Sequence, residues 1–190
     1  MDIAECYRRS LTGWLSVAER EVDDWDKPTP CTEWTLRMLV NHVVGEDRWT
    51  KPLVDGRTIA ELGDSLDGDL LGADAAGAVR AAAQEAVGAV VERLPAGGLV
   101  HLSYGDENIE EYVRQLIADH LVHSWDVAAA TGQDRTLDAD VVADVAAWYT
   151  EREALYRSAG IVAERPSGAS GSTPQDGLLL AFGRDPDWTA

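Results

Sequence analysis

The stretch IADHLVHSWD, residues 117–126, places acidic and imidazole side chains at helical spacing in one predicted helix. Residues four apart in a helix lie one above the other on the same face, so Asp119 and His123 are predicted to point the same way. A carboxylate and an imidazole in that arrangement are suited to bind one divalent metal ion. This stretch therefore indicates an α-helical fold and locates the candidate site.

His42 is the third candidate ligand. It lies in a predicted helix over 35–49, for which Thr35 is a suitable N-cap, and it falls on or beside the apolar face of that helix. Packing of the two helices would bring His42, Asp119 and His123 together. Three protein ligands leave one coordination position open, which is typical of a catalytic metal site rather than a closed structural one.

Other interpretations of these histidines stay open. A single histidine on an apolar helix face is most often a hydrogen-bonded core residue, and this applies to His42 taken alone. His120 lies three residues before His123, a spacing that would also allow the two to share a metal. Asp119 would then accept a hydrogen bond from a ligand histidine instead of binding the metal itself. His101 lies in a predicted loop, and we expect it to face solvent or the mouth of a pocket.

The composition is that of an acidic globular protein. Among 190 residues, 45% are hydrophobic and 26% charged, which predicts a folded chain, and we expect a single domain over residues 1–190. Lys and Arg total 16 against 34 Asp and Glu, which gives a net charge of −18. Because a field of this sign repels phosphates and anionic lipids, we expect neither nucleic acid nor membrane as a partner.

The cysteines and the N-terminal residues bear on the cellular compartment. Cys6 and Cys31 are too few for a disulfide framework, and early charges at Asp2 and Glu5 interrupt any apolar leader. No window approaches the roughly 20 apolar residues of a membrane span. These features predict a cytoplasmic location. Cys31 belongs to no Cys-x-x-Cys pair, and we interpret it as a small buried residue rather than a reactive thiol.

Hydrophobic periodicity predicts an all-α fold, a four-helix bundle with an additional short helix and a loop-rich C-terminal tail. The expected helices cover 2–24, 35–49, 59–62, 74–94, 108–130 and 138–159, with an extended segment over 99–105. Residues 165–177 are rich in Gly, Ser and Pro and predict a mobile loop. The apolar residues 177–183 are then expected to dock on the bundle.

Three stretches, 28–45, 119–132 and 181–188, follow the pattern of a known family. In their order and spacing the chain resembles the DinB-like metal-binding helical bundles, in the branch related to the N-terminal domain of mycothiol-dependent maleylpyruvate isomerase. In that family, a histidine on the second helix and an acid-x-x-x-histidine pair on a later helix bind a divalent metal. The resemblance transfers these roles to His42, Asp119 and His123, with Asp119 where the isomerase relatives have glutamate.

The resemblance implies a thiol-dependent enzyme, a mycothiol-type S-transferase or isomerase, and assembly as a homodimer through helical faces. Zn²⁺ is the favoured metal, with Ni²⁺ or Fe²⁺ as alternatives, because two histidines and one carboxylate also form the facial triad of non-haem iron enzymes. The metal would activate a small-molecule thiol, with mycothiol as the implied cosubstrate, for attack on an electrophilic substrate. Arg114 or Arg48 is expected to anchor a carboxylate of that substrate.

A non-catalytic metal-binding bundle is the alternative function, with the ion in a structural or sensing role. This alternative predicts a large loss of thermal stability when metal is removed, and a narrow or absent substrate cavity. A deep cavity above the open coordination position would instead favour the enzyme.

Overall fold

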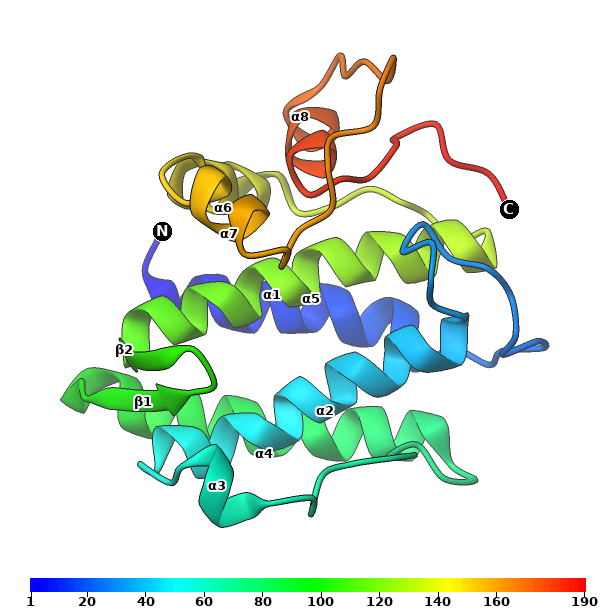
Figure 1. Cartoon of the computed structure of the whole chain (residues 1–190). Helices are drawn as coiled ribbons and strands as arrows, with labels where there is room; N and C mark the ends of the chain where they lie inside the picture. Colours follow the sequence, from blue (N-terminus) through cyan, green and yellow to red (C-terminus); the bar gives the residue numbers. More distant parts are fainter.

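Four long helices form the central bundle of the computed structural model, which describes residues 1–190 (Figure 1). They are α1 (Ile3–Ala18), α2 (Leu36–Val54), α4 (Ala75–Arg93) and α5 (Ile109–Thr131). Helix α5 packs against α1 and α2, and α4 packs against the same two helices, so each helix of the bundle has two neighbours. The predicted all-α fold with a four-helix bundle is confirmed.

Helix α5 is enclosed on nearly every side. From Leu116 to Ala130, every residue except Asp119 is buried. This explains why its hydrophobic residues surround the helix instead of forming one stripe, because a helix that is covered all round needs no polar face. None of the helices combines the length and the apolar character needed to cross a bilayer.

Three short helices cover one side of the bundle. Helices α6 (Ala139–Thr150), α7 (Glu153–Ser158) and α8 (Pro174–Ala181) gather on the side of α1 and α5, away from α4 (Figure 1). Helix α6 contacts α1, α5 and α8. The C-terminal residues therefore dock on the helix that carries Asp119 and His123, as the apolar tail predicted.

A small hairpin lies at one end of α5. Strand β1 (Leu99–Leu102) pairs antiparallel with β2 (Gly105–Asn108), and Val100 is buried opposite Glu107. The sequence predicted an extended segment there but not its partner strand, whose polar residues give no alternating pattern. The remaining short elements are α3 (Ile59–Leu62) and the 3₁₀ turn η1 (Leu94–Ala96).

Side-chain caps fix where the two ligand-bearing helices begin. The Thr35 hydroxyl accepts a hydrogen bond from the Met38 amide at the start of α2, and the Asn108 carboxamide oxygen accepts one from the Glu111 amide at the start of α5. Each cap pairs an N–H group that has no partner within its own helix. Helix α5 ends at Gly132, whose φ of 70° is the left-handed conformation that terminates helices.

Two helix boundaries differ from the sequence expectation. Helix α1 ends at Ala18 instead of 24, and α2 continues beyond 49 to Val54, through Pro52. A proline inside a helix removes one backbone hydrogen bond, which is why the sequence predicted an earlier end. Leu53 and Val54 are nevertheless buried in the core, and their packing holds the last turn in place.

The C-terminal region is more regular than predicted. The helix expected over 138–159 is two helices, because the chain turns at Arg152, whose guanidinium pairs with the Glu111 carboxylate at 2.8 Å. Helix α8 was missed within the Gly- and Ser-rich tail. Its signal is a reciprocal cap in which Thr173 and Asp176 bond each other's backbone, followed by a proline in the first turn.

Replacing Gly132 with alanine tests the cap of α5. The left-handed backbone disfavours any side chain, so Gly132→Ala is expected to lower the free energy of unfolding by about 1 kcal/mol. Gly88→Ala is the matched control, because Gly88 lies on the exposed face of α4, where alanine is expected to add about 0.5–1 kcal/mol. Urea unfolding measures both, and equal effects at the two sites would contradict this account of the cap.

Candidate metal centre

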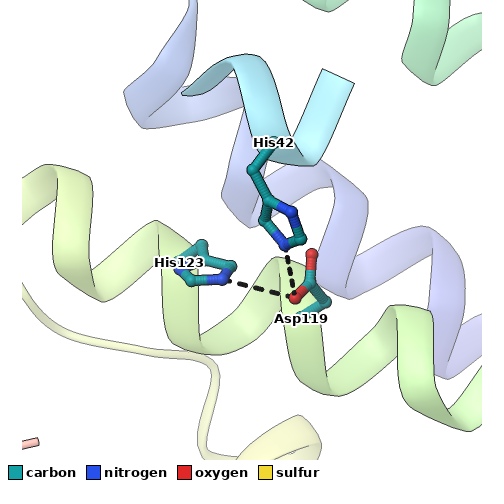
Figure 2. Close-up of side chains that lie close together, drawn as sticks. All are labelled: His42, Asp119 and His123. Carbon is teal, nitrogen blue, oxygen red and sulfur yellow. Dashed lines mark hydrogen bonds and ion pairs between the residues drawn. The ribbon is translucent and has the colours of Figure 1, made fainter. Parts of the chain in front are cut away.

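Three side chains converge between α2 and α5. His42 Nε2 lies 3.4 Å from Asp119 Oδ1, and His123 Nε2 lies 3.3 Å from the same oxygen (Figure 2). One possible ligand atom from each residue falls within 4.8 Å of the other two. Asp119 and His123 project from adjacent turns of α5, and His42 reaches them from α2 (Figure 2). The structure thus brings together the three residues that the sequence selected.

A second carboxylate stands behind His123. Its Nδ1 atom lies 2.9 Å from Asp126 Oδ2, and this contact leaves Nε2 directed toward Asp119. Asp126 is fully buried and also receives the Arg184 guanidinium, at 2.8 Å from Nη2. A carboxylate bonded to one ring nitrogen fixes the tautomer and leaves the other nitrogen free as a ligand. The Arg184 side chain therefore holds Asp126, and Asp126 orients His123.

These contacts shift the pKa values of Asp119 and His123. Burial opposes ionisation of Asp119, yet His123 and then His42 hold its pKa well below the usual range. Burial likewise opposes protonation of His123, but the carboxylates of Asp119 and Asp126 raise its pKa to about 9. Without a metal ion, His123 is therefore an imidazolium at neutral pH, ion-paired with Asp119.

An indole ring packs on both imidazoles. The Trp34 ring centroid lies 4.7 Å from that of His42 and 5.9 Å from that of His123, with the second pair stacked. The two imidazoles meet edge to face at 5.2 Å. Trp34 precedes the N-cap of α2, so the chain entering this helix restricts the rotation of the imidazoles that flank the carboxylate.

The other histidines lie elsewhere. His120 is buried, and its Nε2 atom lies 3.0 Å from Asp47 Oδ1, so it pairs within the core instead of joining the three-residue group. His101 lies on β1, where its Nδ1 atom is 2.7 Å from Asp106 Oδ1 across the hairpin. Cys31 is half-buried, and burial raises the pKa of its thiol, which matches the sequence interpretation of an unreactive residue.

A cavity of about 370 Å³ opens beside the convergent side chains. His42, Asp119 and His123 line one part of it. Aromatic side chains from the hairpin, α5, α6, α7 and the residue after α8 line another part, namely Tyr104, Tyr112, Trp148, Tyr156 and Phe182. This position explains why Asp119 is less buried than its neighbours in α5, because its side chain borders the cavity.

The cavity holds a carboxylate where the sequence predicted an arginine. Glu46 follows His42 by one turn of α2 and lines the cavity, and burial followed by the charge of Asp119 raises its pKa. Arg114 instead pairs with Asp144 at 2.9 Å, and Arg48 faces a different surface hollow. The expectation that Arg114 or Arg48 anchors a substrate carboxylate is not supported, because neither side chain lines the cavity.

The residues of this centre suit a divalent cation. Two imidazole nitrogens and one carboxylate oxygen are the donors that zinc and related ions prefer. In addition, Asp119 Oδ2 is buried and has no hydrogen-bond partner. An unpaired buried polar atom is unfavourable by roughly 1–3 kcal/mol, and a bound cation would offset that cost.

Sequence reasoning missed the outer residues for different reasons. Asp126 follows His123 by three positions, and this helical spacing could have predicted a carboxylate that hydrogen-bonds the second ring nitrogen of a metal-binding histidine. Glu46 follows His42 by four positions and was equally readable. Arg184 was not, because it is 58 residues from Asp126 and only the docking of the C-terminal segment brings it there.

Together, the fold and the convergent donors define a DinB-like helical bundle with a candidate two-histidine, one-carboxylate centre. The family of the mycothiol maleylpyruvate isomerase N-terminal domain matches residues 8–128. The chain belongs to this family, which confirms the resemblance read from the sequence. The matched region contains His42, Asp119 and His123 but ends before Arg184.

Two uncharacterized proteins of Mycobacterium tuberculosis are similar to this chain, one from strain H37Rv and one from strain CDC 1551 / Oshkosh. Each is 29% identical over 154 residues, which cover 76% of this chain and 75% of the relative. No solved structure gives a significant match.

Replacing Asp126 tests the link between the C-terminal segment and His123. Asp126→Asn leaves the buried Arg184 guanidinium without its counter-charge, and we expect a loss of about 3 kcal/mol in the free energy of unfolding. The exposed Glu92→Gln on α4 is the control and is expected to change stability by less than about 0.5 kcal/mol. Adding Arg184→Gln to Asp126→Asn should cause little further loss, whereas additive effects in urea unfolding would refute the coupling.

Proposed function

We propose that this protein binds a divalent metal ion through His42, Asp119 and His123 and uses it in a thiol-dependent reaction, as an S-transferase or isomerase. Zn²⁺ is the proposed metal, and mycothiol is the proposed cosubstrate because the family is named for a mycothiol-linked isomerase. The observation that carries the proposal is the convergence of three donor atoms at the wall of a cavity.

The protein side chains prepare the centre. Asp126 accepts a hydrogen bond from His123 Nδ1, Arg184 donates to Asp126, and Trp34 packs on both imidazoles. A metal ion in this site would supply a Lewis acid that lowers the pKa of a thiol. Only three protein ligands are offered, which leaves space for such a thiol from the cavity side.

The reaction uses the thiol in one of two balanced ways. In a transfer, the S–H bond breaks, sulfur bonds to the electrophilic carbon, and a leaving group departs with its electron pair. In an isomerisation, sulfur and hydrogen add across a carbon–carbon double bond, the resulting single bond rotates, and elimination returns the thiol. Glu46 offers a proton acceptor on the cavity wall for either route, because it forms no ion pair with an arginine or lysine.

The cavity distinguishes this proposal from a purely structural metal site. A structural zinc site is closed by its ligands and has no need of a neighbouring cavity. Here the cavity volume of about 370 Å³ falls within the range of small-molecule sites, and its wall is mainly aromatic and aliphatic. These features support a catalytic role for the centre.

Ligand variants test the metal centre directly. His42→Ala and His123→Ala are each expected to weaken Zn²⁺ binding at least about 100-fold, more than the roughly 10–100-fold effect of losing an outer-shell partner. His101→Ala, a histidine on the hairpin, is the control and should retain full affinity. The proposal also requires that turnover of mycothiol with an electrophile stop on chelation and return with Zn²⁺. Stoichiometric Zn²⁺ binding by both ligand variants would show that the metal lies elsewhere.

Metal uptake should release a proton. Because the pKa of His123 is about 9 without metal, the imidazolium must lose its Nε2 proton before that atom can bind an ion. Affinity should therefore rise with pH up to about 9 and then level off. Calorimetry in two buffers of different ionisation enthalpy should give about one proton released per ion at pH 7.5. Uptake with no proton release would place the metal away from His123.

A further inference from the structure

The cavity wall is mostly apolar away from His42, Asp119 and His123. Besides its five aromatic rings, it includes Ile161 and Val162 from the segment after α7 and Leu116 and Val122 from α5. Tyr104 and Ile161 at the rim are 60% and 59% exposed. Large apolar side chains on a rim of this kind mark a surface that binds an apolar ligand.

The positive side chains of the same wall are already paired: the His123 imidazolium contacts the carboxylates of Asp119 and Asp126. Arg184 is the one arginine that lines it, and no lysine does. The Arg184 guanidinium is already engaged by the Asp126 carboxylate through Nε and Nη2, and by the Phe182 carbonyl through Nη1. Glu46 adds a carboxyl group that repels an anion when it is ionised. An anionic ligand would therefore lose its hydration without gaining a counter-charge from the wall.

One hydrogen-bond donor on the wall has no partner. The Tyr156 hydroxyl on α7 is buried and forms no hydrogen bond, whereas the Tyr104 hydroxyl already bonds Gln115. Burial raises the pKa of Tyr156, so its hydroxyl stays protonated and remains a hydrogen-bond donor. A carbonyl or nitro oxygen of a neutral ligand would satisfy this donor.

We propose that the cavity binds a neutral electrophile with an aromatic or aliphatic body and a carbonyl-type acceptor, held by the aromatic wall and by Tyr156, and that carboxylate-bearing electrophiles are excluded. The description of this ligand as an electrophile rests on the proposed thiol chemistry. The binding preference itself depends only on the wall and is tested without thiol, both in the presence and in the absence of a chelator.

A matched pair of unreactive probes separates the two classes of ligand. Acetonaphthone and naphthoate have the same ring system, but the first is a neutral ketone and the second an anion. Calorimetric titration of the full-length protein, with and without chelator, is expected to show at least about tenfold tighter binding of the ketone. Naphthoate that binds as tightly as the ketone in either condition overturns the inference, as does a failure of the ketone to bind.

Substitutions locate the binding in this cavity. Ile161→Asp places a charge on the rim and should weaken ketone binding about tenfold or more. Leu155→Asp is the control, because Leu155 is equally exposed on α7 but does not line the cavity. Tyr156→Phe should weaken binding of the ketone several-fold and leave methylnaphthalene unaffected. Equal effects of the two aspartate variants, or ketone binding unchanged in Tyr156→Phe, would contradict the assignment.

The result of these binding tests can be distinguished from the result for the proposed metal and thiol chemistry. Ketone binding with no Zn²⁺ uptake would reject the metal chemistry and keep the ligand class. Zn²⁺-dependent turnover of an anionic electrophile in preference to its neutral analogue would keep the metal chemistry and reject the ligand class.

Discussion

The buried ion pair between Arg184 and Asp126 is the contact on which the candidate centre depends. Asp126 is fully inaccessible, and a buried carboxylate is unfavourable unless a positive or hydrogen-bonding group compensates it. Arg184 supplies that compensation from the C-terminal segment, and His123 supplies the rest from the preceding turn of α5. One interaction thus joins the docking of the tail, the orientation of an imidazole and the charge balance of the core.

The bundle uses its polar groups in two separate places. Around Asp119, the imidazoles of His42 and His123 and the carboxyl group of Glu46 line a cavity. Around Asp47, the carboxylate pairs with His120 inside the core, and no opening reaches them. His120 and His123 are only three residues apart on α5, yet His120 packs against Asp47 in the core and His123 lines the cavity.

Much of this arrangement could be predicted from local sequence pattern. The ranges predicted for α4 and α5, 74–94 and 108–130, differ from the observed Ala75–Arg93 and Ile109–Thr131 by one residue at each end. The three convergent residues followed from helical spacing together with the family resemblance. Arg184 could not be predicted, because the energy of its contact depends on tertiary docking and leaves no local periodicity. Helix α8 does have a local signal, its capping box, but the flanking glycines and serines masked that short signal.

The stacking of Trp34 on the two imidazoles has an optical consequence. Indole emission is sensitive to a charged imidazolium or a transition ion at van der Waals range, and Trp34 lies against both rings. The protein therefore contains an intrinsic reporter of the electrostatic state between α2 and α5, with no dye or label to disturb the packing. A Trp34→Phe variant would isolate its contribution from those of the six other tryptophans.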